Sequence, residues 1–140
     1  MFENPSQADI DALVRRAKTI AVLGLSDTPG KPSHHVAEEL QKFGYRIVPV
    51  NPAATEILGE KSWPDLDSAM KGAGPIDVVD VFRRPEHVAA IVDDAIRLKV
   101  PALWLQEGVV DETAAARARA AGIFTVMNRC MYKTRLALKN

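Results

Sequence analysis

The sequence predicts a single α/β domain over residues 1–140, with a Rossmann-like, doubly wound sheet of five mainly parallel strands and helices on both faces. Three observations predict this class. Five short apolar runs alternate with segments of helical periodicity along the chain. Apolar and polar residues alternate little within the runs, which is typical of strands covered on both faces. Strands that alternate with helices are joined by right-handed crossovers, which place them parallel in one sheet.

The expected strands are rich in β-branched and other apolar residues. They are Ile20–Leu23, Arg46–Val50, Asp77–Phe82, Ala102–Leu105 and Phe124–Met127. Pro49 lies inside the second run, and proline is awkward in a central strand because it cannot donate to the ladder. We retain this strand, with the proline near its end.

Capping and periodicity signals predict five helices around these strands. The first, roughly Ser6–Lys18, precedes the first strand. Ser33 is expected to cap the second, and a short third helix is expected near Pro64–Met70, because proline is favoured at the first helical position. Pro85 opens the strongest helix, whose apolar residues recur at helical spacing. Asp111 begins an alanine-rich helix with its acidic residues first, as the helix dipole favours.

Composition excludes several classes of function. Apolar residues make up 47% of the chain, charged residues 26%, and the formal net charge is zero, as in ordinary soluble domains. A nucleic-acid-binding protein would normally carry a positive stripe, and none is present. No apolar run approaches the ~18 residues of a membrane span, and the N-terminus does not look like a signal peptide. We expect a cytoplasmic protein that binds neither nucleic acid nor membranes.

A ligand of such a sheet binds at the carboxyl ends of the strands, where the strand order reverses. Small, amide and arginine side chains follow the five runs. Loops are polar in most proteins, but five separate loops that are polar at one edge favour a ligand site. The residues at this edge are Gly24, Leu25 and Ser26, then Asn51 and Pro52, then Phe82, Arg83 and Arg84, then Gln106 and Gly108, and finally Asn128 and Cys130.

The turn after the first strand suits a phosphate group. Gly24 lets the backbone approach a ligand closely, and the amides at the start of the Ser33 helix, with Lys31 beside them, attract an anion. The turn fits neither common phosphate motif. Five residues separate Gly24 from Gly30 where a P-loop has four, and Lys31 is followed by proline. The dinucleotide pattern has three glycines, and only Gly24 and Gly30 are present.

Arg83 and Arg84 are the best further partners for a phosphate, because a guanidinium group matches phosphate oxygens in pairs. NAD is the obvious phosphate ligand to consider. It would need an acidic residue near the end of the second strand to bind the ribose hydroxyls, and Val50-Asn51-Pro52 stands there instead. The sequence therefore weakens NAD as the ligand.

His34 and His35 raise the question of a metal site. Adjacent residues point about 100° apart on a helix, so the two do not form a chelating pair. Only His87 and Cys130 remain as further histidine or cysteine ligands, and we expect no metal site. One of the two histidines is a candidate contact for a phosphate. Cys130, the single cysteine, is either a small residue at a strand end or an accessible thiol on the ligand rim.

The segments GLSDTPGKPSHHV, RIVPVNP, VVDVFRRPEHV, WLQEGV and NRC, in this order, strongly resemble the small single-domain CoA-binding proteins. These are relatives of the CoA-binding domain in the α subunit of succinyl-CoA synthetase. The similarity runs from about Thr19 to the C-terminus. The resemblance implies a Rossmann-like fold with coenzyme A bound across the carboxyl edge of the sheet.

Carried over residue by residue, the resemblance implies a role for each part of this edge. Gly24 and Ser26 would contact the pyrophosphate, with Lys31, Ser33 and His34 beside it. Val50, Asn51 and Pro52 would line the adenosine side, and Phe82 and Arg83, with Arg84, would lie under the nucleotide. Gln106 and Gly108 would flank the pantetheine, and Asn128 and Cys130 would lie toward its thiol. Many relatives carry Asp in place of Asn128, and MYKTRLA lacks an acidic residue that the family leads us to expect.

The lead hypothesis is a stand-alone protein that binds CoA or acyl-CoA without catalysis of its own. In the synthetase, ligation depends on a further domain with a phosphorylated histidine and on a partner subunit, and the residues after Asn128 are too few to supply either. No nucleophile with a paired base is evident. Two alternatives stay open: an enzyme or enzyme subunit of CoA-dependent acyl or thiol transfer, and a Rossmann sensor of NAD or ADP. A homodimer or an unknown partner enzyme is compatible with the sequence.

Overall fold

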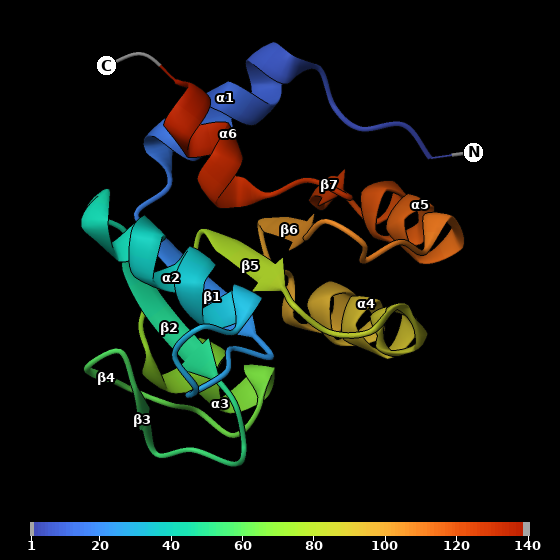
Figure 1. Ribbon diagram of the computed structural model, residues 1–140. Coiled ribbons are helices and arrows are strands. Elements are labelled where there is room, and N and C mark those ends of the chain that lie inside the picture. The colour runs from blue at the N-terminus through green and yellow to red at the C-terminus, as the bar shows by residue number, and fades with distance from the viewer. Residues whose placement is uncertain (1, 139–140) are drawn as a thin grey trace.

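The structure, a computed structural model, describes residues 2–138 and is built around a five-stranded sheet. The strand order is β2-β1-β5-β6-β7, and every neighbouring pair is parallel (Figure 1). The strands are β1 (Thr19–Leu23), β2 (Arg46–Val50), β5 (Val78–Val81), β6 (Ala102–Leu105) and β7 (Phe124–Met127). All five expected strands are present, each within two residues of its expected bounds. The predicted fold class is confirmed.

Helices cover both faces of the sheet. One face packs against α1, α2 and α6, and the other against α3, α4 and α5 (Figure 1). Their bounds are α1 (Gln7–Arg16), α2 (Pro32–Lys42), α3 (Leu66–Gly72), α4 (Val88–Leu98), α5 (Glu112–Ala120) and α6 (Met131–Ala137), with a 3-10 turn, η1 (Pro85–His87), before α4. None of these helices is long and apolar enough to cross a membrane.

Alternation along each strand divides the apolar side chains between two cores. In β1, Ile20 and Val22 face α1, α2 and α6, while Ala21 and Leu23 face the other three helices. Trp104 of β6 is fully buried on the α1–α2–α6 side. Because both faces are buried, the strands read as continuous apolar runs, which is why the sequence located them.

Pro49 is tolerated because β2 is the outermost strand of the sheet. Its carbonyl oxygen accepts a hydrogen bond from the backbone N–H of Trp63, at 2.9 Å, on the side away from β1. The next residue, Val50, faces β1 and accepts from the Gly24 amide at 3.1 Å. The missing donor of proline therefore falls on the edge of the sheet and not within the ladder.

A side chain covers part of the opposite edge. The Asn4 amide nitrogen donates to the Met127 carbonyl at 3.0 Å, and its oxygen accepts from the Met127 N–H at 2.7 Å. Asn4 thus pairs with β7 as a neighbouring strand would, and it anchors the segment before α1 to the last strand.

Two expected helix starts were wrong by two residues. Ser33 is not the N-cap of α2: the helix begins at Pro32, and the Ser33 hydroxyl oxygen accepts from the Ser26 N–H at 2.9 Å. The third helix begins after Asp65, whose carboxylate accepts from the Ser68 N–H at 2.7 Å, so Pro64 lies outside it. In both cases the sequence offers a proline and a capping side chain close together as signals for the helix start. The proline marks the start of α2, and the Asp65 cap marks the start of α3.

Two elements were not expected at all. One is a two-stranded hairpin of β3 (Glu56–Ile57) and β4 (Glu60–Lys61), and the other is α6. Both are too short to show a clear periodicity. The helix α6 matters for function because it packs beside α2 and α1 over the end of the sheet (Figure 1).

The chain leaves β1 in one direction to form β2 and then crosses back to place β5 on the other side of β1. The strand order therefore reverses between β1 and β5. In open α/β sheets the crevice at the carboxyl ends of such a pair is the usual place for a ligand. Here the residues that follow these strands are Gly24 and the Phe82–Arg83 pair.

Candidate ligand site at the carboxyl edge of the sheet

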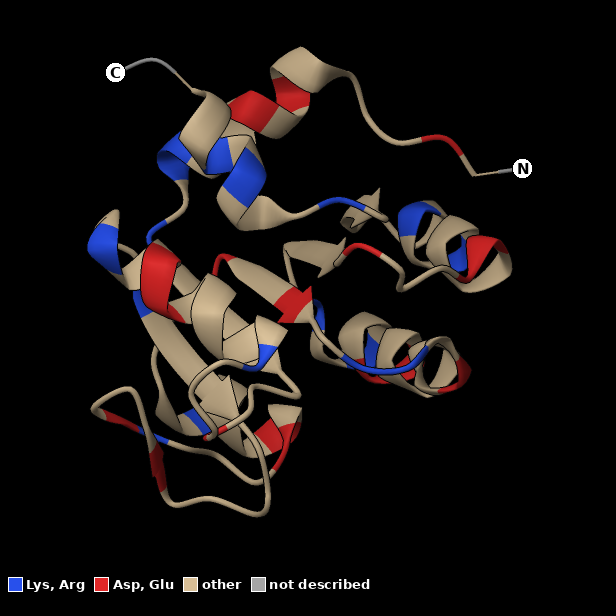
Figure 2. Cartoon of the chain, viewed as in Figure 1, with Lys and Arg blue, Asp and Glu red and all other residues tan. Residues whose placement is uncertain are grey.

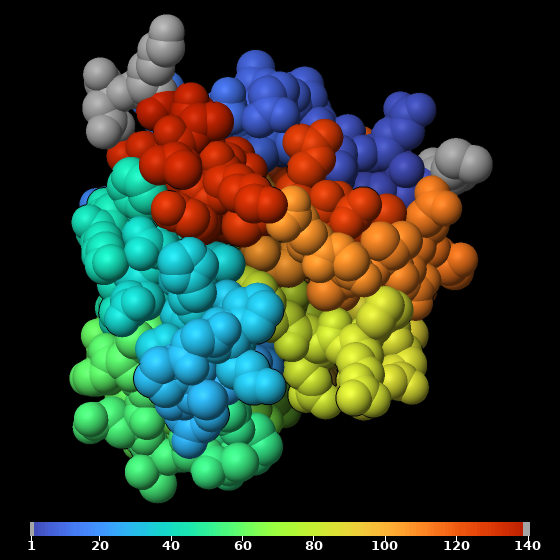
Figure 3. Space-filling model, in the orientation of Figure 1, coloured from blue at the N-terminus to red at the C-terminus, as the bar shows by residue number. Residues whose placement is uncertain are grey.

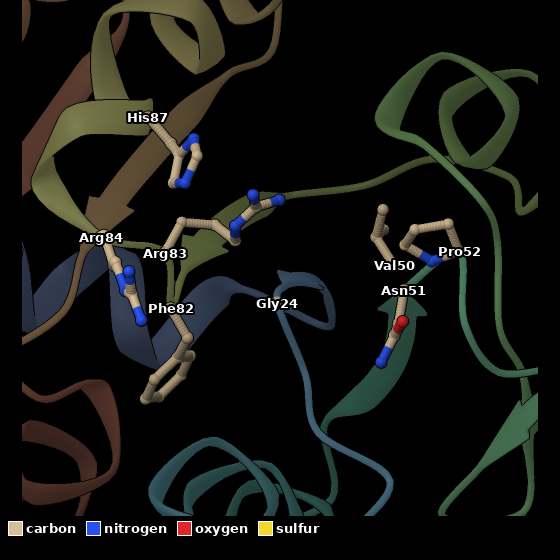
Figure 4. Close-up of a pocket in the computed structure, with 8 residues that line it drawn as sticks. All are labelled: Gly24, Val50, Asn51, Pro52, Phe82, Arg83, Arg84 and His87. Carbon is tan, nitrogen blue, oxygen red and sulfur yellow. The ribbon is translucent and has the colours of Figure 1, made fainter.

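Three cavities surround Phe82 at this edge. The first, the β2 cavity, has a volume of about 480 Å³ and lies between the turn after β1 and the loops after β2 and β5 (Figure 4). It is lined by Gly24, Val50, Asn51, Pro52, Phe82, Arg83, Arg84 and His87.

The second, the central cavity, also measures about 480 Å³ and lies between the start of α2 and the loops after β5 and β6. In Figure 3 it opens as a hollow between the light-blue segment that leads into α2 and the yellow segment that leads into α4. Its expected lining residues are Ser26, Lys31, Ser33, Phe82, Arg83, Arg84 and Gly108.

The third, the α6 cavity, measures about 260 Å³ and lies between α2 and α6. It shares Pro32, Phe82 and Glu107 with the central cavity, so the two adjoin. Gln106 and Cys130, both expected on the rim, line it. The three cavities adjoin one another along the carboxyl edge of the sheet, from the end of β2 to Cys130.

Gly24 fits where no other residue would. Its φ is +79°, a conformation that favours glycine, and a Cβ placed there would lie 2.8 Å from the Cδ of Arg83 and collide with the Phe82 carbonyl oxygen. The turn after β1 and the loop after β5 are therefore in direct contact. This contact brings the backbone of Gly24 to the floor of the β2 cavity.

Arg83 extends into the β2 cavity, with its guanidinium group toward Val50 and Pro52, while Arg84 points away on the other side of Phe82 (Figure 4). Among the ion pairs of residues 2–138, Arg83 has no acidic partner, and Arg84 meets Glu86 only at 3.9 Å. Figure 2 shows this positive charge in the connection between β5 and α4. An unpaired guanidinium beside a cavity favours an anionic ligand.

The start of α2 faces the central cavity. Lys31 precedes the helix without a side-chain cap, so amides of the first turn retain their donors for a ligand. Ser26 and Ser33 hold the entry loop together, since the Ser26 N–H donates to Ser33 and the Thr28 N–H donates to the Ser26 hydroxyl at 3.0 Å. The positive end of the helix dipole adds to the charge of Lys31.

Several predicted site residues shape the loops. The Asn51 amide donates to the Leu25 carbonyl at 2.9 Å and thereby ties the loops after β1 and β2 together. Asn128 has a φ of +60°, and its side-chain oxygen accepts from the Gly108 N–H at 2.9 Å, which joins the loops after β6 and β7. Gln106 accepts from the Met131 N–H at 3.1 Å and fixes the start of α6.

Three predicted residues do not line any of these cavities. Leu25 is fully buried, His34 is 8% exposed, and Asn128 is exposed outside the three cavities, with its side chain hydrogen-bonded to Gly108. The other expected residues line at least one cavity. Within residues 2–138, no three His, Cys, Asp or Glu side chains come together as metal ligands would.

Residues that sequence reasoning missed lie mainly around the α6 cavity. His35 lines it, whereas the neighbouring His34 was chosen from the sequence. A helix start at Pro32 places Pro32, His35 and Val36 on one face, and that spacing could have identified His35. Tyr132 and Lys133 could not be placed because α6 was not expected. His87, which was weighed only as a metal ligand, lines the β2 cavity, and Glu107, which follows the fourth strand, lines the α6 cavity.

A buried carboxyl group lies beneath this site. Asp80 of β5 is fully buried, two residues before Phe82, between Val22 of β1 and Trp104 of β6. Neither of its oxygens has a hydrogen bond of good geometry among the described residues. Burial raises the pKa of Asp80 well above its ordinary value, and the nearby Val81 amide offsets this only in part. Burial therefore favours the neutral, protonated form of Asp80.

Residues 18–135 match the family described as CoA binding domain. The chain belongs to this family. It is 40% identical over 130 residues to the uncharacterized protein YneT of Bacillus subtilis, covering 93% of this chain and 94% of that protein. A hypothetical protein from Pyrococcus horikoshii superposes with a TM-score of 0.87 at 31% identity, over 99% of each chain. A stretch of 51 residues, 35% of this chain, is 41% identical to 8% of the ADP-forming acetate–CoA ligase II of Archaeoglobus fulgidus.

Proposed function

We propose that this CoA-binding domain protein binds coenzyme A at the carboxyl edge of its sheet and acts without catalysis of its own. The observation that carries the proposal is the unpaired Arg83 guanidinium, which lies in the β2 cavity beside the Gly24 turn, at the point where the strand order reverses. An anion held between a basic side chain and open backbone amides is the arrangement that a nucleotide phosphate requires.

The three cavities match the three parts of the ligand in order. The β2 cavity, with Val50, Asn51 and Pro52 on one wall, takes the adenosine side. The start of α2, with Ser26 and Lys31, takes the pyrophosphate in the central cavity. The pantetheine then passes Gly108 toward Cys130 in the α6 cavity.

Absence of catalysis is proposed because the reactive groups are not paired. Covalent catalysis requires a nucleophile within hydrogen-bond reach of a base. Among the described residues no hydrogen bond joins the Cys130 thiol to a histidine or carboxylate. Asp80, the buried acid nearest to the site along β5, does not line any of the three cavities.

Calorimetric titration of the purified chain, stripped of bound ligand, tests the proposal. CoA, 3′-dephospho-CoA, ADP and NAD are compared under one set of conditions. We expect CoA to bind tightest. We expect 3′-dephospho-CoA to bind more weakly, because it lacks the 3′-phosphate that basic side chains would contact. NAD or ADP binding as tightly as CoA would replace this proposal with a nucleotide sensor. Turnover of an acyl-CoA by the isolated chain would contradict the absence of catalysis.

A further inference from the structure

We propose that the α6 cavity receives a short, uncharged aliphatic acyl group, so that the preferred ligand is an acyl thioester of CoA and not free CoA. This inference rests on the proposed function, because CoA binding places the thiol end at this cavity. It adds the chemical class of the group that the thiol carries.

The lining of the α6 cavity is mostly carbon. Its apolar lining comes from Pro32 and Val36 of α2, from Phe82 after β5 and from Tyr132 of α6. The Gln106 side-chain oxygen is already occupied by the Met131 N–H. A bare thiol would leave this apolar surface in contact with water, whereas an acyl chain would cover it.

The α6 cavity adjoins the central cavity, where CoA is proposed to bind. Phe82 and Glu107 border both the central and the α6 cavities. The volume of about 260 Å³ limits the occupant. A methylene is about as large as a water molecule, which occupies ~30 Å³ in the liquid, so the end of the pantetheine and a few further carbons fill the space.

The charges at the rim select against a carboxylate. Lys133 of α6 donates to both carboxylate oxygens of Glu107, at 3.0 and 3.2 Å. This pair raises the pKa of Lys133 and keeps both charges satisfied. An acyl group with its own carboxylate would have to compete with Glu107 for Lys133 and would place a second negative charge beside it. An aliphatic acyl group meets neither obstacle.

His35 offers a way to close the cavity without changing the phosphate contacts. It is exposed on α2 and meets the Tyr132 ring edge-on, with 5.9 Å between the ring centroids and an angle of 87° between the planes. It lines the α6 cavity but neither of the other two. A larger ring at this position would occupy the space proposed for the acyl group.

The test titrates the wild-type chain with CoA, acetyl-CoA, butyryl-CoA and succinyl-CoA. Butyryl and succinyl groups have the same number of carbons, so they separate size from charge. Each methylene that becomes buried adds up to about fourfold in affinity. We expect butyryl-CoA to bind at least fivefold tighter than CoA, and succinyl-CoA to bind more weakly than butyryl-CoA.

Two variants sharpen the result. In His35→Trp, butyryl-CoA should lose its advantage over CoA. In Glu107→Gln, Lys133 is released, and the affinity for succinyl-CoA should rise relative to butyryl-CoA. If CoA binds but butyryl-CoA binds no tighter, the acyl inference is overturned and the proposed function stands. If neither CoA nor any thioester binds, both are overturned.

Discussion

An added side chain at Gly24 would collide with the backbone carbonyl of Phe82. The two residues directly follow the neighbouring strands β1 and β5, so their contact sets the spacing of the crevice in which we propose the nucleotide binds. The same glycine donates its N–H to Val50 of β2. One position therefore holds three strand ends in register with each other.

Gly24→Ala should destabilise the fold and weaken CoA binding together. A left-handed conformation costs an L-residue about 1–2 kcal/mol, and the collision with Phe82 adds to that cost. Chemical denaturation and calorimetric titration measure the two effects. Gly30→Ala is the matched control, because Gly30 also has a positive φ, +94°, but nothing lies within 4 Å of an added Cβ. Equal losses in both variants would show that the contact with Phe82 is unimportant.

Arg83→Ala should weaken CoA binding by about 1.5–3 kcal/mol, the usual contribution of a hydrogen bond to a charged group. Stability without ligand should change little, because Arg83 is exposed and has no acidic partner among the described residues. Titration calorimetry measures the affinity. Arg16→Ala, at the exposed end of α1, removes a charge outside the three cavities and serves as the control. An unchanged affinity for CoA in Arg83→Ala would remove Arg83 from the site.

Buried Asp80 should make the wild-type chain less stable as the pH rises, and Asp80→Asn should remove this effect. Below the unfolded pKa of Asp, 3.8, both states hold the proton and the group has no effect. Above it the unfolded chain releases the proton while buried Asp80 keeps it. The free energy of unfolding then falls by up to about 1.4 kcal/mol per pH unit until the raised folded pKa is reached.

Urea midpoints measured from pH 4 to 8 test this effect of Asp80. The variant should gain stability over the wild type as the pH rises. Asp27→Asn, which removes a carboxyl group from an exposed turn, is the control. A constant difference between Asp80→Asn and the wild type would mean that the folded and unfolded chains hold this proton equally.

Asn128→Ala should destabilise the fold by roughly 1–3 kcal/mol, because alanine is strained at a φ of +60° and the Gly108 N–H loses its acceptor. Asn128→Gly relieves the strain but not the lost hydrogen bond, so it should fall between alanine and the wild type. Asn128→Asp retains an acceptor and should stay closest to the wild type. Thermal unfolding of the four chains gives the order. Alanine as stable as glycine would mean that the backbone at this position is not constrained.

The sheet could be predicted because burial on both faces leaves a plain apolar run at each strand. In a parallel sheet, the residues that follow each strand lie at the carboxyl edge. For this reason Gly24, Arg83 and Cys130 could be assigned to the same edge of the sheet before any contact was known. Pairings between side chains are a different matter. The hydrogen bond from Gly108 to Asn128 depends on the conformation of two loops, and the contact of Lys133 with Glu107 depends on α6. Neither the loops nor this short helix produces a periodic pattern in the sequence.

His34 and His35 show the limit most clearly. Moving the start of α2 by one residue changes which of the two faces a cavity, since adjacent helical side chains point about 100° apart. Sequence patterns place helix boundaries less accurately than that. The choice between two neighbouring histidines therefore needed the coordinates.

The Asn4 side chain on β7 and the Trp63 backbone beside β2 also bear on how two copies of this chain could meet. Exposed strand edges are templates on which another chain can add a strand. Here the backbone N–H and carbonyl of Met127 are already hydrogen-bonded to the Asn4 side chain, and Pro49 has no N–H to donate at the other edge. Growth of one continuous sheet across two molecules is therefore disfavoured at both of its edges.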